Sequence, residues 1–249
     1  MTNHISIITH ANPQPATALG EARAILDSVK AGKRGSTARI YRPQPTLAFG
    51  ARDRFLAGFR SAIAAARKHH FTPVLRSLGG RVAPYHLGSL VVDHCEPAEG
   101  LYGEVEKRFA QFAQFYAEAL QSLGISAEVG NLPGEYCPGE YSIHVGHQIK
   151  AVGTAQRVSK GGWLFSSSFI VENPTPIRAV LTDVQAALGM SWDPATGGSI
   201  TELHPHITVS HVAKALHEAY SRYYVTSPGT LSPEEIKTAH RYSTGHMLA

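Results

Sequence analysis

The sequence predicts an α/β (α+β) fold in which a mixed β-sheet is flanked by helices. Strand-like apolar patterns alternate along the chain with longer patterns of helical period, which is typical of layered architectures. Three consecutive strand patterns fill residues 141–171, and short glycine turns join them as antiparallel neighbours. These strands disfavour a purely parallel, doubly wound sheet. The length of 249 residues suits one substantial core.

The first half of the chain contains two helical patterns. Residues 15–30 place apolar side chains at helical spacing and stop before Gly32, so we expect an amphipathic helix there. A second helix is expected at 54–70. Strands are expected at 38–42, 46–50, 72–76 and 89–93, the last of them buried on both faces. Residues 77–88 are too rich in glycine and proline for regular structure.

The second half contains the longest helical pattern and a hairpin. Residues 101–123 place a stripe of aromatic and aliphatic side chains on one helix face. In the hairpin, we expect Gly146 and His147 to form the turn between strands at 141–145 and 148–156. The other expected elements are strands at 125–129 and 162–171, a helix at 174–189, a loop at 190–199, and helices within 200–224 and 232–243.

The composition predicts a cytoplasmic protein. Only two cysteines occur, Cys95 and Cys137, which are too few for a disulfide framework and fit a reducing compartment. No apolar run is long enough to span a membrane, and the N-terminus lacks a signal-peptide pattern. The net charge of +4 forms no dense basic stripe, so we expect no nucleic-acid partner. The fourteen histidines occur without an HExxH or CxxC motif, so we expect no metal site.

Cys137 is the candidate nucleophile. It lies in a Pro-Gly turn, and a thiolate beside a cation such as Lys150 is a good nucleophile. Glu135 and Glu140 flank it, and one of them could serve as a base. The structural alternative is a small apolar filler, which suits Cys95 better because it ends an apolar strand. Lys150 itself, in an apolar strand, either reaches the surface or holds an oxyanion or carboxylate.

Two adjacent glycines, Gly79 and Gly80, follow an expected strand. Glycines let a backbone bend close to a ligand, and the exposed amides can then hold a phosphate or a carbonyl group. The chain contains neither a dinucleotide-binding glycine pattern nor a P-loop pattern, so these two kinds of nucleotide site are not supported. A plain connecting loop is the alternative.

With these residues identified, the chain resembles the biotin/lipoate protein ligase and octanoyltransferase superfamily over roughly residues 35–200. The run from Arg76 to His86 looks like the family's lipoyl-binding loop, and the run from Lys150 to Arg157 looks like its second motif. The resemblance implies a ligase-like catalytic domain at 1–200, with the acyl chain in a tunnel beneath the glycine loop. Residues 201–249 would form a helical C-terminal extension packed on the same domain. The substrate-binding residues implied by the resemblance are Arg76, Gly79, Gly80, Tyr85, His86, Gly153 and Thr154.

The run Cys137-Pro-Gly-Glu-Tyr, followed by Lys150, is similar to the cysteine-dependent octanoyl transferases. The resemblance implies that an octanoyl (or lipoyl) group moves to a lysine of a lipoyl domain through a thioester on Cys137, without a cofactor. Cys137 and Lys150 would be the catalytic residues, with Lys150 and loop amides stabilising the oxyanion. His86 would either transfer a proton or order the loop.

The implied partners are lipoyl-domain proteins, namely the glycine cleavage H protein and the 2-oxoacid dehydrogenase E2 component, or an acyl carrier protein. Such partners tend to be acidic, and a basic face would suit their docking. The residues expected on that face are Arg76, Arg81, Arg157 and Lys160.

Two alternatives belong to other classes. The first is an ATP-dependent lipoate-protein ligase that uses ATP and magnesium to form an acyl-adenylate, and the second is a non-catalytic binder of acyl groups or lipoyl domains. Gly79-Gly80-Arg81 stands where many ligases have three glycines, and Gly161-Gly162-Trp163 stands where they usually have a His-Gly pair. Neither alternative explains the Cys137 loop, so the transferase is preferred.

Overall fold

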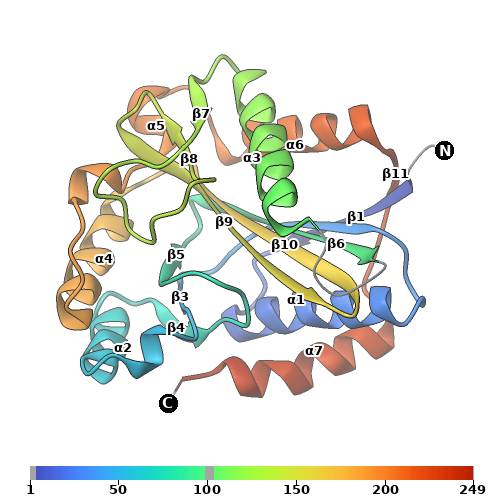
Figure 1. Ribbon diagram of the computed structural model, residues 1–249, viewed down its shortest axis with the longest axis horizontal. Helices are drawn as coiled ribbons and strands as arrows, with labels where there is room; N and C mark the ends of the chain where they lie inside the picture. The colour runs from blue at the N-terminus through green and yellow to red at the C-terminus, as the bar shows by residue number, and fades with distance from the viewer. Residues whose placement is uncertain (1–3, 99–103, 249) are drawn as a thin grey trace.

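The computed structural model describes residues 4–98 and 104–248, and it contains a large mixed sheet covered by helices (Figure 1). The strand order is β11 (Val225–Pro228), β1 (His4–Ala11), β2 (Thr37–Arg42), β6 (Ser89–Ala98), β10 (Gly161–Ile170), β9 (Ile149–Ser159), β8 (Ile143–Val145) and β7 (Ala127–Val129). Strands β11, β1 and β2 pair in parallel, and every other neighbouring pair is antiparallel. The expected mixed sheet is confirmed.

The expected hairpin of the second half is present. Val145 pairs with Ile149 across the turn, and Gly146 and His147 both have the positive φ that a tight turn requires. The next strand, β10, pairs with β9 over most of its length. The central part of the sheet is therefore built from strands that are neighbours in the sequence, and for this reason the sequence predicted it well.

A second, three-stranded sheet was not expected. It consists of β4 (Thr72–Leu75), β3 (Thr46–Phe49) and β5 (Ala83–Tyr85). The prediction that residues 77–88 lack regular structure is wrong at β5, which pairs antiparallel with β3. Pro84 is tolerated there because β5 lies at an edge of the small sheet, where a missing backbone N–H costs little.

Helices lie on both sides of the large sheet. In Figure 1, α3 (Val105–Gln121) and α6 (Val209–Tyr223) lie above the sheet, whereas α1 (Pro15–Lys30) lies below it with α7 (Pro233–His246) packed along α1. The remaining helices are α2 (Phe59–Lys68), α4 (Thr175–Leu188) and the short α5 (Ile200–Leu203), with 3₁₀ turns η1 (Asp53–Phe55) and η2 (Pro194–Thr196). Helices α2 and α4 pack together and support the small sheet at one end of the molecule.

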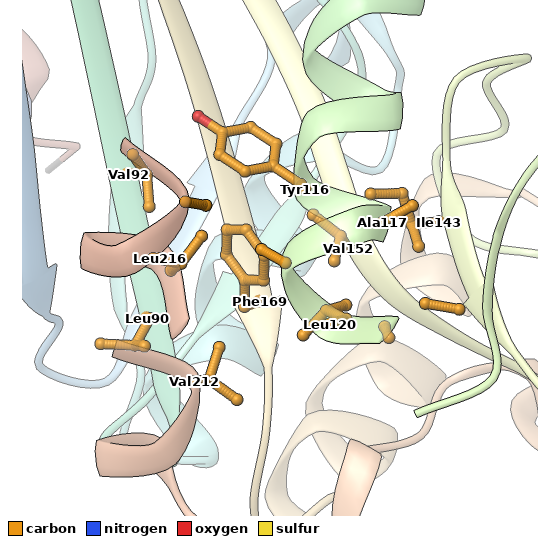
Figure 2. Close-up of a cluster of buried hydrophobic side chains, with 14 of the residues drawn as sticks. Leu90, Val92, Tyr116, Ala117, Leu120, Ile143, Val152, Phe169, Val212 and Leu216 are labelled. Atoms are coloured by element: carbon orange, nitrogen blue, oxygen red, sulfur yellow. The ribbon is translucent and has the colours of Figure 1, made fainter. Parts of the chain in front are cut away.

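The largest core lies between the sheet and the pair α3 and α6. Figure 2 shows Tyr116 and Leu120 of α3 directed toward Phe169 of β10, while Val212 and Leu216 approach from α6. All five side chains are essentially inaccessible to solvent. Burying a large apolar side chain contributes about 1.5–3 kcal/mol, so this contact fixes α3, whose first turn forms one wall of the cavity described below.

Several predicted helices have different bounds for identifiable reasons. The helix expected at 54–70 is divided into the turn η1 and helix α2, because the backbone is extended at Leu56, whose ψ is 138°. The segment 200–224 divides into α5 and α6 around Pro205, which cannot continue a helix. Of the helix expected at 101–123, residues 101–103 lie outside the described residues.

The two ends of the chain contain strands that periodicity did not reveal. The run HISIITHA forms β1 between two parallel partners, and β11 pairs with it at the sheet edge. The C-terminal extension is therefore not wholly helical. Its helix α7 packs along α1, and His246 donates from Nδ1 to the carbonyl oxygen of Leu75 at 2.6 Å. A domain boundary at residue 200 stays a prediction.

Within the described residues, no helix is both long and apolar enough to cross a lipid bilayer.

A buried ion cluster joins α1 to the sheet. The guanidinium group of Arg39 on β2 is fully buried, and its Nη2 lies 2.6 Å from Asp93 Oδ2 on β6. Nη1 pairs with Glu21 of α1, and Nη2 also donates to the Ala18 carbonyl oxygen. The arginine thus compensates two carboxylates that have no access to water.

We predict that Arg39→Met destabilises the protein by about 3–5 kcal/mol, because it removes the buried cation from its ion pairs with Asp93 and Glu21. Lys33→Met is the control, since Lys33 pairs with Glu234 at an exposed position and the pair should contribute little. Urea unfolding followed by circular dichroism measures both free energies. Equal free energies of unfolding for the two variants would contradict the conclusion that Arg39 compensates buried carboxylates.

Candidate active site

A cavity of about 520 Å³ opens where the two sheets meet. Its walls come from the first turn of α3, the loop 136–142, the glycine loop before β5, and the inner faces of β9 and β10. Eight of the nine residues predicted from the sequence line it: Arg76, Gly79, Gly80, Tyr85, Cys137, Lys150, Gly153 and Thr154. The fold thus brings together two motifs that lie far apart in the chain, and their roles toward a substrate stay predictions.

Cys137 lies at the cavity wall in a strained turn. Its φ of +48° is in the left-handed region, which costs a residue with a β-carbon roughly 1–2 kcal/mol. The side chain is half-buried, and Sγ accepts a hydrogen bond from the backbone N–H of Arg81 at 3.1 Å. The thiol is free, as is the fully buried Cys95 of β6. The backbone strain and the amide donor distinguish Cys137 from a filler residue.

Lys150 lies beneath the Cys137 turn and is only 3% exposed. Its Nζ donates to the carbonyl oxygens of Tyr136 at 3.0 Å and Cys137 at 2.7 Å. Burial lowers the pKa of the ammonium group below the ordinary lysine value, and the Glu135 carboxylate opposes this shift. Lys150 therefore does not reach the surface, and its predicted contact with an acyl carbonyl group stays a prediction.

Glu135 is a buried residue that the sequence analysis considered only as a possible base. Its Oε2 lies 3.3 Å from Lys150 Nζ, and its Oε1 accepts hydrogen bonds from the Gly139 N–H and the Ser142 hydroxyl, both at 2.9 Å. Glutamate is almost never fully buried without a partner. Its position two residues before Cys137 was the available signal, but only the fold shows that it faces Lys150.

The glycine loop approaches the thiol closely. Gly80 has a φ of +87°, and a β-carbon there would lie 2.6 Å from Arg76 Nη2 and 3.2 Å from Cys137 Sγ. At Gly79 a β-carbon would meet only the Gln156 carbonyl oxygen, at 4.0 Å. Glycine is thus required at the second of the two positions, where the backbone must pass between a guanidinium group and a thiol.

Arg76 points into the protein. It is 6% exposed, and its Nη2 donates to the carbonyl oxygen of Arg81 at 2.6 Å. Among the described residues, no carboxylate forms an ion pair with Arg76, so its charge is directed at the cavity. The expectation that Arg76 belongs to a basic docking face is therefore wrong, because the side chain is needed under the glycine loop. Arg81, also expected on that face, pairs with the buried Asp53 at 3.2 Å.

His86 does not line the cavity. Its Nε2 donates to the Asn173 carbonyl oxygen at 2.7 Å, and its Nδ1 accepts from the Gly88 N–H at 2.9 Å. Both ring nitrogens thus hold backbone groups. Of the two roles expected for His86, these contacts support ordering of the loop rather than proton transfer.

Part of the cavity lining suits an apolar chain. Gly153 and Ser168 both line the cavity, and a β-carbon at Gly153 would lie 3.5 Å from Ser168 Oγ. The lining also contains Phe109 stacked on Tyr141, with ring centres 5.5 Å apart and planes 7° from parallel. A cavity with aromatic rings and a thiol in its lining can hold an acyl group with its carbonyl carbon near Sγ.

Comparison with solved structures shows the class of protein that has this fold. A crystal structure of lipoate-protein ligase A bound with ATP superposes with a TM-score of 0.75 at 18% identity, covering 98% of this chain and 95% of that one. A bipartite lipoate protein ligase from Thermoplasma acidophilum gives 0.77 at 17% identity, covering 97% and 92%. The fold is that of the lipoate-protein ligases.

The chain belongs to the lipoyl protein ligase A/B catalytic domain family, which matches residues 14–221. It is 29% identical over 158 residues to an octanoyl-GcvH:protein N-octanoyltransferase of Geobacillus kaustophilus, covering 64% of this chain and 56% of the relative. A Bacillus velezensis protein of the same name is 26% identical over 225 residues, covering 84% and 77%. The match to the Geobacillus protein thus spans little more than half of that relative's length.

We predict that Gly80→Ala lowers the free energy of unfolding by about 1–3 kcal/mol, because alanine is strained at positive φ and its methyl group crowds Arg76. Gly79→Ala should cost much less, since no atom lies close to the added methyl group. Thermal unfolding at matched buffer conditions compares the two. A larger loss for Gly79→Ala would show that the loop is packed differently.

Proposed function

We propose that the protein is an octanoyltransferase that moves an octanoyl (or lipoyl) group to a lysine of a lipoyl domain through a thioester on Cys137. The observation that carries the proposal is the thiol itself, half-buried in the cavity with the Arg81 N–H directed at its sulfur. The family and the names of its relatives support the substrate class.

The transfer occurs in two steps. Cys137 Sγ attacks the acyl carbonyl carbon, the bond to the donor breaks, and the proton of the thiol passes to the donor's leaving group. The ε-amine of the acceptor lysine then attacks the thioester, an amide bond forms, the carbon–sulfur bond breaks, and the proton released by the amine returns to Cys137 Sγ. Both tetrahedral intermediates carry an oxyanion, which amides of the glycine loop would stabilise.

Binding of the acyl chain uses the apolar part of the cavity. Each methylene removed from water contributes about 0.8 kcal/mol, and the wall of Phe109 and Tyr141 offers the surface for it. Arg76, which forms no ion pair among the described residues, also lines the cavity, and its charge would favour a developing oxyanion. The cavity thus orients the chain with its carbonyl group at Cys137.

The partners follow from the same proposal. The acceptor is a lipoyl-domain protein such as an E2 component, and the donor is an octanoylated H protein, as the relatives' name indicates for them. An acyl carrier protein is the alternative donor. The free thiols of Cys95 and Cys137 support a cytoplasmic location.

We predict that the parent protein gains one octanoyl group when it is mixed with octanoylated H protein in the absence of ATP, and that Cys137→Ala gains none. Intact-protein mass spectrometry measures the adduct, and hydroxylamine should remove it because thioesters are labile to this nucleophile. Cys95→Ala is the matched control and should still form the adduct, since Cys95 is fully buried away from the cavity.

An outcome without any adduct, but with modification of a lipoyl domain once ATP, magnesium and free lipoate are added, would contradict the proposal. It would identify the chain as an ATP-dependent ligase. Acyl binding with neither adduct nor turnover would identify a non-catalytic binder.

A further inference from the structure

The transfer steps give no role to the buried ion pair of Glu135 and Lys150 beside the nucleophile. Glu135 is 2% exposed and lies two residues before Cys137. Burying a carboxylate costs several kcal/mol unless it is paired and hydrogen-bonded. The contacts of Glu135 show what it holds in place.

Glu135 forms contacts that stabilise the chain on both sides of Cys137. Through Oε1 it accepts from the Gly139 N–H and the Ser142 hydroxyl, which lie after the cysteine in the chain. Through Oε2 it pairs with Lys150, whose ammonium group binds the carbonyl oxygens of Tyr136 and Cys137. One carboxylate thus connects the segment before the thiol, the segment after it, and strand β9.

The lysine contacts explain the strained backbone of Cys137. Two successive carbonyl groups, of Tyr136 and Cys137, point at the same ammonium group, and Cys137 has a φ of +48° in this arrangement. A cysteine rarely adopts this conformation, so the surrounding contacts must stabilise it. With this backbone, Sγ lies 3.1 Å from the Arg81 N–H.

The two buried cations near the thiol, Lys150 and Arg76, differ in how their charges are compensated. Lys150 has three protein oxygens around Nζ, and its charge is offset by Glu135. Arg76 is the buried cation of the cavity that has no carboxylate partner among the described residues. Arg76 and the loop amides can therefore stabilise developing negative charge, while Lys150 already binds the backbone of the Cys137 turn.

We propose that Glu135 is a positioning residue which, through Lys150 and Ser142, holds the Cys137 turn in its reactive conformation. Lys150 then acts on the backbone that carries the thiol, in addition to the oxyanion contact expected from the resemblance. The catalytic readout of this inference rests on the proposed function, whereas its structural readout does not.

The inference predicts a pH dependence. The groups that face the Lys150 ammonium are Glu135, Cys137, Tyr136 and Arg76. Burial already lowers the pKa of Lys150, and Glu135 opposes this, so removal of the carboxylate lowers the pKa further. The protonated lysine is the form that binds the two carbonyl groups. Without Glu135, Lys150 should lose its proton at a lower pH than in the parent protein. The Cys137 turn should then open as the pH rises.

The test compares Glu135→Gln with Glu128→Gln, which makes the same change at a half-exposed glutamate of β7 that pairs with His147 outside the cavity. The first readout is the rate of Cys137 octanoylation between pH 6 and pH 9.5. We expect octanoylation of Cys137 at pH 8.5 to be at least tenfold slower in Glu135→Gln than in the parent. As the pH is raised, the rate of this variant should begin to fall at a lower pH than the rate of the parent. Glu128→Gln should follow the parent profile.

The second readout is hydrogen exchange of the peptide 134–143, measured by mass spectrometry at the same pH values. This measurement needs no acyl transfer, so it tests whether Glu135 holds the Cys137 turn even if no thioester forms. We expect faster exchange in Glu135→Gln, with a difference from the parent that grows with pH, and no change in Glu128→Gln. Parent-like exchange and a parent-like rate profile in Glu135→Gln would overturn the proposal.

Ser142→Ala covers the case in which Glu135→Gln does not fold. This variant removes one hydrogen bond to Oε1 and keeps the ion pair. We expect octanoylation to be several-fold slower and exchange of the 134–143 peptide to be faster. If both stay at the parent's values, Glu135 does not hold the turn.

Discussion

The arrangement of the cavity depends on the burial of the Lys150 charge beneath the Cys137 turn. An ammonium group that is 3% exposed must find oxygen atoms inside the protein, and it finds them in two backbone carbonyl groups and one carboxylate. Since those carbonyl groups flank the thiol, the requirement to compensate one charge also determines the backbone at Cys137. The position of Sγ against the glycine loop follows from that backbone.

The molecule keeps its buried charges in separate clusters with different consequences. Arg39 lies with Glu21 and Asp93 between α1 and the large sheet, where the cluster joins secondary-structure elements. Lys150 and Glu135 stabilise a loop, and their charges cancel. Among the described residues Arg76 forms no ion pair, so its positive charge faces the cavity beside the thiol, in a lining that also includes Glu106 and Glu140. A site built in this way suits chemistry in which negative charge appears on a carbonyl oxygen.

Much of this site could be predicted because its parts are local. The hairpin that carries Lys150 and Gly153 has a turn and alternation that a short window of sequence reveals. Gly80 and Cys137 could also be identified from short motifs, namely the pair of adjacent glycines and the Pro-Gly turn. Strands β5 and β11 were missed, because short edge strands acquire their structure from partners far away in the chain. His86 was placed in the site by its motif, but its ring binds the loop instead.

The sequence by itself determined the mixed sheet with flanking helices, the glycine loop, and the cysteine turn with a lysine in the strand that follows. These features depend on periodicity and on residue types with narrow conformational preferences, which act over a few neighbouring residues. Only the tertiary structure decided that Arg76 points inward, that Glu135 pairs with Lys150, and that Lys150 binds the backbone around the thiol. Charge pairing depends on burial and on long-range contacts, and no local pattern encodes either.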